Sequence, residues 1–135
     1  MTRRRRRIDT NSQRGQTAVE FALIAPMLIV LVLGVLQIGI AFNHYLTVTD
    51  AARVAARAAA SGRFSNITAA QVQQSARDAA ADLNQTDLNV TVANPTWNVP
   101  QSDVTITVTY PYSIDLLGWV VASGNLKSTM TERVE

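Results

Sequence analysis

The sequence predicts an α+β protein. A long N-terminal helix, membrane-spanning and extending outside, is followed by a short helix and a small antiparallel sheet of about three strands. Two observations support this fold class: an uncharged apolar run covers residues 21–42, and apolar residues alternate with threonine and other polar residues from residue 88 onward. Apolar positions repeat about every 3.6 residues in helices and every two in strands. The 135 residues therefore allow one membrane segment and one small domain outside it.

The apolar run Phe21–Phe42 is long enough to cross a bilayer. Its 22 residues carry no charge, and Gln37 is the one clearly polar side chain among them. As a helix this run covers about 33 Å, compared with about 30 Å of bilayer hydrocarbon. Pro26 is expected to kink the helix near its cytoplasmic end, and Gly34 and Gly39 permit close helix contacts.

A basic arm precedes the apolar run. Residues 1–14 contain six arginines and one aspartate, a net charge of +5, whereas the six basic and nine acidic residues that follow give −3. The positive-inside rule places the arm in the cytoplasm and everything after Phe42 outside. An arginine run this close to a membrane helix does not indicate nucleic-acid binding, so no nucleic-acid partner is expected. The orienting residues are Arg3, Arg4, Arg5, Arg6, Arg7 and Arg14.

The helix is expected to continue beyond the membrane. Residues 43–60 contain neither glycine nor proline, and their second half is rich in alanine, the strongest helix former. Ser61-Gly62 supplies a stop. We therefore expect one continuous helix over residues 16–60, from about Thr17, with a transmembrane part at residues 21–42. The alanines form a small-residue face suited to tight packing.

Residues 61–135 are predicted to form a small extracytoplasmic α+β domain. Thr68 is expected to cap a second helix over about Ala69–Leu83. Pro111 is expected to end the second strand, residues 114–122 to form a short helix or loop, and Ser123-Gly124-Asn125 to form a turn. Trp97 and Trp119 are expected in the core. The alternating segments that predict strands are Leu88–Val92, Val104–Tyr110 and Leu126–Val134.

The sequence does not favour an enzyme. It has no cysteine, and its single histidine, His44, lies at the expected membrane surface. The aspartates of the outer domain are spread along the chain without obvious convergence. We therefore expect no catalytic residues, no metal and no cofactor.

Gly15 and Glu20 stand between the basic arm and the apolar run. A basic arm, a glycine, an acid five residues later and a spanning helix are together typical of a prepilin-type signal. A carboxylate at the start of a membrane helix is costly unless it is paired. Cleavage after Gly15 would create an α-amino group on Gln16, which is largely protonated at neutral pH. That amine could neutralise Glu20 of a neighbouring chain and fix the register between the two helices.

Two other interpretations of the apolar run stay open. The chain could be an unprocessed single-pass anchor that carries an extracytoplasmic interaction module. An ordinary secretory signal peptide has less support, because the run is too long and the helix shows no sign of ending after it.

The residues Gly15–Pro26, with the sequence GQTAVEFALIAP, resemble the start of TadE-like proteins, the minor pseudopilins of the tight-adherence (Flp) pilus. In that family a glycine precedes four variable residues and a Glu-Phe or Glu-Tyr pair, and a proline commonly follows within the helix. The alanine- and arginine-rich stretch Asp50–Ala60 also resembles the family's usual continuation. The resemblance covers about Arg14–Ala60.

The resemblance implies cleavage between Gly15 and Gln16 by a membrane aspartyl prepilin peptidase, which removes residues 1–15 as a cytoplasmic leader. It also implies that Glu20 and Phe21 act in processing and assembly. A bacterial inner-membrane location follows, with possible incorporation into a surface pilus. The implied partners are the peptidase, other pilins and pseudopilins bound through the N-terminal helix, and the pilus assembly platform with its ATPase. The outer domain argues for a minor component, since the major pilins of that system are little more than the helix.

Overall fold

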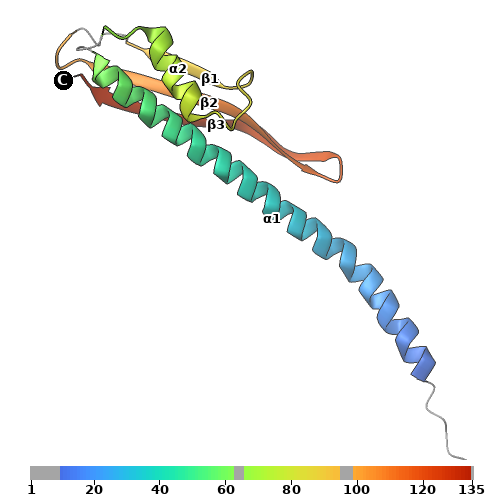
Figure 1. The fold of residues 1–135 in the computed structure, drawn as a ribbon. Coiled ribbons are helices and arrows are strands. Elements are labelled where there is room, and N and C mark those ends of the chain that lie inside the picture. Colours follow the sequence, from blue (N-terminus) through green and yellow to red (C-terminus); the bar gives the residue numbers. More distant parts are fainter. Residues whose placement is uncertain (1–9, 63–65, 95–98, 135) are drawn as a thin grey trace, which may run out of the picture.

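The structure is a computed structural model that describes residues 10–62, 66–94 and 99–134. Two helices, α1 (Thr10–Ala60) and α2 (Ala69–Ala79), precede three strands, β1 (Asn89–Ala93), β2 (Asp103–Leu116) and β3 (Trp119–Arg133). Figure 1 shows α1 running along the whole domain and projecting far beyond it. The predicted α+β arrangement is confirmed. The expectations for Arg3–Arg7 and Trp97 fall outside the described residues.

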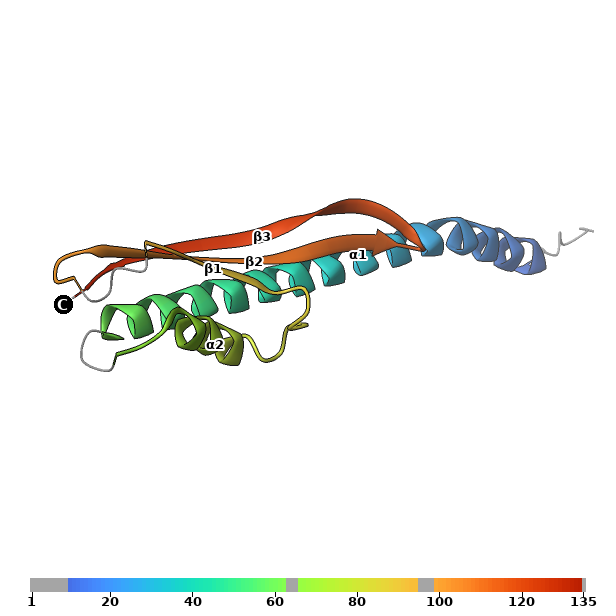
Figure 2. The same cartoon turned by 90° about the horizontal axis from the view of Figure 1, so that it is seen from above.

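The strands form one antiparallel sheet in the order β1-β2-β3. Both helices cover the same face of this sheet, as the view in Figure 2 shows. The opposite face is polar: the hydroxyl groups of Thr105 and Thr131 lie 3.0 Å apart, and those of Thr107 and Thr129 lie 3.1 Å apart. The domain therefore has two layers and a core on one side of the sheet only.

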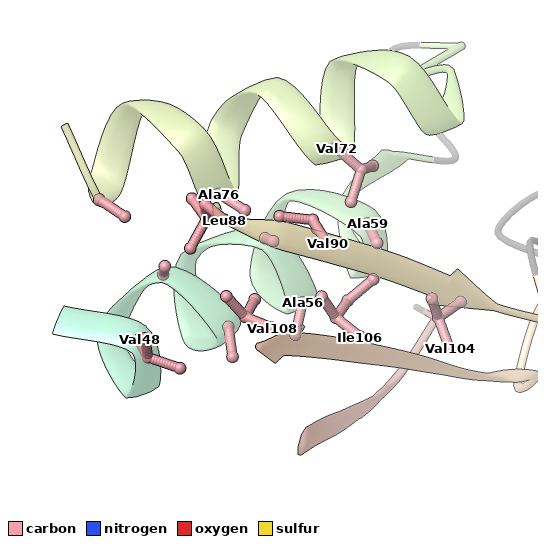
Figure 3. Close-up of a cluster of buried hydrophobic side chains, with 14 of the residues drawn as sticks. Val48, Ala56, Ala59, Val72, Ala76, Leu88, Val90, Val104, Ile106 and Val108 are labelled. Atoms are coloured by element: carbon pink, nitrogen blue, oxygen red, sulfur yellow. The ribbon is translucent and has the colours of Figure 1, made fainter. Parts of the chain in front are cut away.

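The C-terminal half of α1 supplies the helical side of the core. Its fully buried residues recur every three or four positions, which places them on one face of the helix. Because most of them are alanines, the helix lies close to the sheet, where Val104, Ile106 and Val108 meet it (Figure 3). The small-residue face predicted from the sequence is thus the packing face. It consists of Val48, Ala51, Ala52, Ala55, Ala56 and Ala59.

Helix α2 begins as predicted and ends earlier than predicted. The Thr68 side chain accepts from the Gln71 backbone N–H, and the Gln71 side chain accepts from the Thr68 backbone N–H, which is a capping box. The helix ends at Ala79 instead of Leu83, because the chain turns there and the side chain of Gln85 donates to the carbonyls of Ala80 and Leu83. Leu83 still packs in the core.

Strands β2 and β3 are much longer than predicted. The expectations that Pro111 ends a strand, that residues 114–122 form a short helix or loop, and that Ser123-Gly124-Asn125 forms a turn are wrong. Pro111 lies inside β2 opposite Asn125. Because β1 pairs only as far as Thr109, the strand has one free edge at Pro111, and a proline is tolerated there. Gly124 lies inside β3, opposite Tyr112.

A two-residue turn joins β2 to β3. Leu117 and Gly118 have φ angles of 54° and 85°, and positive φ at both central positions is the signature of a type I′ hairpin turn. Beside the turn the register shifts, because Ile114 pairs with Ala122 whereas Asp115 pairs with Val120. The expected core position of Trp119 is wrong, since this residue is 81% exposed where β3 leaves the turn.

Candidate functional site

The N-terminal half of α1 carries the predicted functional residues and extends away from the folded domain (Figure 1). Among the described residues one helix is long and apolar enough to cross a membrane, namely α1 over Gly15–Ala60. No residue in the most apolar stretch of this helix is buried within the protein. Because its large side chains are exposed on every side, this half needs an apolar environment. These side chains include Val19, Phe21, Leu23, Ile24, Met27, Leu28, Ile29, Leu31, Val32, Val35, Leu36, Ile38, Ile40 and Phe42.

The residues of the predicted signal occupy consecutive turns at the start of this helix. The side-chain amide of Gln16 donates a hydrogen bond of 3.1 Å to the Glu20 carboxylate, one turn further along. Glu20 is exposed, and the neighbouring Phe21 is exposed as well. The motif thus presents a carboxylate and an aromatic ring to the surroundings of the helix.

Helix α1 begins at Thr10, about seven residues before the predicted start. Residues 10–14 contain neither glycine nor proline, so the helix propagates backward from the apolar run at little cost per residue. The predicted cleavage bond, between Gly15 and Gln16, therefore lies inside the helix. Arg14 belongs to the helix as well, but its side chain falls outside the described part of the chain.

The glycines of this half have open surroundings. Apart from the neighbouring backbone of the helix itself, a Cβ atom added at Gly15, Gly34 or Gly39 would meet no described atom within 4 Å. Glycine destabilises a helix interior by about 0.5–1 kcal/mol relative to alanine. Packing among the described residues therefore gives no reason for glycine at these positions, which leaves their small size available to an external partner.

Pro26 lies within α1 and does not end it. A proline inside a helix removes one backbone hydrogen bond and clashes with the preceding turn. Figure 1 shows α1 curving gently toward its N-terminal end.

Gln37 makes a contact that sequence reasoning did not find. Its side-chain amide donates to the backbone carbonyl of Asp115 and accepts from the Asp115 backbone N–H at 2.7 Å. The only clearly polar side chain of the apolar run is therefore paired with the backbone of the β2–β3 hairpin. The partner is 78 residues away and uses no side chain, so no motif could have indicated it.

A groove of about 310 Å³ lies between α1 and β2 next to this contact. The rings of His44 and Tyr110 meet edge to face beside it, with centroids 5.5 Å apart. Further along α1, Asp50 and Arg53 form an exposed ion pair of 3.5 Å. Among the described residues, no group of three or more His, Cys, Asp or Glu side chains could hold a metal ion.

A comparison with known families finds a match over this helix. Residues 15–57 match the family model described as TadE-like protein. This stretch of α1 is similar to TadE-like proteins. The TadE-like stretch starts at the predicted signal glycine and ends three residues before α1 does. No curated protein and no solved structure matches the chain.

The TadE-like match confirms the resemblance drawn from Gly15–Pro26. It supports a protein associated with the tight-adherence pilus. The one long apolar helix found among the described residues is consistent with a single-pass membrane anchor. The match includes all of the exposed half of α1 from Gly15 and most of its alanine face, and it stops before α2 and the sheet.

Proposed function

We propose that the protein is a TadE-like minor pseudopilin, which assists assembly of a tight-adherence (Flp) pilus or of a related secretion system. The observation that carries this proposal is that the TadE-like match includes the exposed half of α1 from Gly15 onward together with its signal residues. The TadE-like match begins at Gly15, where the exposed half of α1 carries the signal residues, and that half makes few contacts with the rest of the chain. The protein acts through assembly and not through catalysis.

In this proposal the helix crosses the bacterial inner membrane once, with its N-terminus in the cytoplasm and residues 61–135 outside. The charge asymmetry of the sequence supports this orientation, because the +5 arm precedes the apolar run and the chain after it is acidic. Prepilin peptidase then cleaves between Gly15 and Gln16. The open surroundings of Gly15 favour its recognition, since no described side chain would meet a Cβ atom placed there.

Assembly follows from the new N-terminus. Removal of residues 1–15 leaves an α-amino group on Gln16 and removes the arginines that resist extraction from the membrane. In the bilayer, an unpaired Glu20 carboxylate is costly, so the amine of a neighbouring pilin is a favourable partner. Phe21 and the surrounding apolar side chains then pack laterally, and the assembly platform with its ATPase drives the chain into the fibre.

Processing is tested by expressing the protein with and without a prepilin peptidase. We expect a shorter product only with the peptidase, and no shortening when Gly15→Val places a branched side chain at the cleavage bond. Gly34→Val is the matched control, because Gly34 has equally open surroundings and lies far from that bond. A full-length wild-type product in the presence of an active peptidase would leave only an unprocessed membrane-anchored interaction module.

Assembly is tested separately with Glu20→Gln. We expect normal cleavage but about a tenfold or greater loss of co-purifying pilin, which corresponds to about 1.4 kcal/mol of lost contact energy. Asp50→Asn is the control, because it removes an exposed carboxylate from the other half of the same helix. Equal loss in both variants, or no loss in either, would contradict the role given to Glu20.

A further inference from the structure

The β2–β3 hairpin extends beyond the rest of the sheet. After the pair Asn89–Thr109, β1 no longer accompanies β2, and the two longer strands continue as a ribbon from Tyr110 to Leu126. This ribbon runs along α1 toward its N-terminal half (Figures 1 and 2). A two-stranded ribbon is marginally stable by itself. The contacts of Gln37 with Asp115 and of His44 with Tyr110 hold it against the helix.

The contact of Gln37 with Asp115 fixes the position along α1 of the hairpin tip, Leu116–Ala122. Gln37 lies five residues before Phe42, where the apolar run ends, and this separation corresponds to about 7.5 Å along the helix. If Phe42 marks the outer end of the hydrocarbon span, the contact that holds the tip lies about 7.5 Å inside the boundary between head groups and acyl chains. Amphipathic segments at membrane surfaces bury their apolar faces to about 5–10 Å, the same depth.

The chemistry of the tip suits that depth. Leu117 is 73% exposed, Trp119 81%, and Val120 and Val121 63% each. Asp115 is the only charged residue between Asp103 and Lys127. Its carboxylate accepts a hydrogen bond of 2.9 Å from the Ser113 hydroxyl. Tryptophan is enriched where membranes meet water, because its ring is apolar and its N–H is polar.

The turn residue Leu117 is poorly explained by folding in water. Its φ of 54° lies in the left-handed region, which type I′ turns fill with asparagine, aspartate or glycine. A bulky residue there is uncommon and destabilising. Since the side chain is largely exposed, packing within the chain does not offset this penalty. An unfavourable turn residue that gains no packing contact within its own domain indicates a contact with something outside it.

We propose that the hairpin tip, Leu116–Ala122, inserts into the outer interface of the bilayer, with lipid as its partner. The anchored tip and the Gln37 contact together hold the outer domain at a fixed height beside its own transmembrane helix. This proposal rests on the membrane-spanning helix of the proposed function and concerns residues beyond the TadE-like match.

The depth of Trp119 tests the proposal in the full chain. Trp97→Phe leaves Trp119 as the single tryptophan. This variant is reconstituted in vesicles of phosphatidylcholine and phosphatidylglycerol that carry a nitroxide either near the head group or near the end of the acyl chain. We expect several-fold stronger quenching of Trp119 by the shallow nitroxide than by the deep one, together with weak quenching by aqueous acrylamide. The control is a single tryptophan placed by Thr131→Trp in the variant that lacks both native tryptophans. It should be quenched weakly by either nitroxide and strongly by aqueous acrylamide.

Leu117→Asn separates lipid contact from hairpin folding. Asparagine suits the left-handed turn position, so the ribbon should form at least as well as before. We expect weaker quenching of Trp119 by the shallow nitroxide, while the amide of Asp115 keeps its protection from hydrogen exchange. Unchanged quenching in this variant would show that the turn residue does not contact lipid.

The other outcomes overturn the inference in distinguishable ways. If the helix resists alkaline extraction from the vesicles but acrylamide quenches Trp119 freely, the tip lies in water and only this inference fails. If neither quencher reaches Trp119 and dilution with lipid restores access, a second copy covers the tip in place of lipid. If alkali extracts the whole chain, the membrane-spanning helix of the proposed function fails as well.

Discussion

At the scale of single residues, the sequence identifies Gln37 as unusual but does not identify its partner. Its isolation among apolar neighbours is plain in the sequence, and so is the motif of Gly15, Gln16, Glu20 and Phe21. The partner of Gln37 is not predictable, because it is the backbone of Asp115 at a register shift 78 residues away. A buried or membrane-embedded amide needs such partners, since an unsatisfied polar group there is costly.

Gln37→Leu is expected to release the hairpin from α1. It removes two hydrogen bonds to Asp115, each worth about 0.5–1.5 kcal/mol net. The amide of Asp115 should therefore exchange its hydrogen about tenfold faster or more, as measured by hydrogen–deuterium exchange. Gln74→Leu is the control, because it removes a side-chain bond on α2 that does not involve the hairpin. Equal exchange rates for Asp115 in wild type and Gln37→Leu would mean that the contact does not hold the hairpin.

At the scale of elements, α1 was the most predictable part and the hairpin the least. The absence of glycine and proline from residues 43–60 and the spacing of the alanines predict that the helix reaches Ala60 and which of its faces packs, and both are confirmed. Local signals failed in β2 and β3: Pro111 and Gly124 are typical of turns, yet a free strand edge tolerates the first and a facing Tyr112 covers the second. The pairing partners decide these cases, and pairing is not local.

The alanine face makes the outer domain sensitive to side-chain volume. Ala55 is fully buried against the sheet, so Ala55→Leu should lower the free energy of unfolding of this domain by about 1–3 kcal/mol through overpacking. Val54→Leu, at the neighbouring exposed position, should change it by less than about 0.5 kcal/mol. Urea unfolding of the full chain in detergent, followed by near-ultraviolet circular dichroism, measures both. Equal effects would contradict the close packing of α1 on the sheet.

At the scale of the whole molecule, one helix joins two environments. The large side chains of its N-terminal half are apolar and exposed, whereas its C-terminal half contributes one face to the core of a two-layer domain. The sequence predicts this division because hydropathy and alanine content change along α1. The domain beyond residue 57 carries no motif from which a role could be read, and the TadE-like match ends there as well. Its candidate lipid-facing tip became visible only once the fold placed residues 116–122 beside the apolar run.

Whether α1 is a processed pilin-type helix is measured by the intact mass and N-terminal residue of the protein extracted from membranes of its native host. We expect a chain that begins at Gln16 and lacks Met1–Gly15, with its basic arm removed. A full-length chain from cells that contain an active prepilin peptidase would contradict it, and α1 would then be a plain membrane anchor.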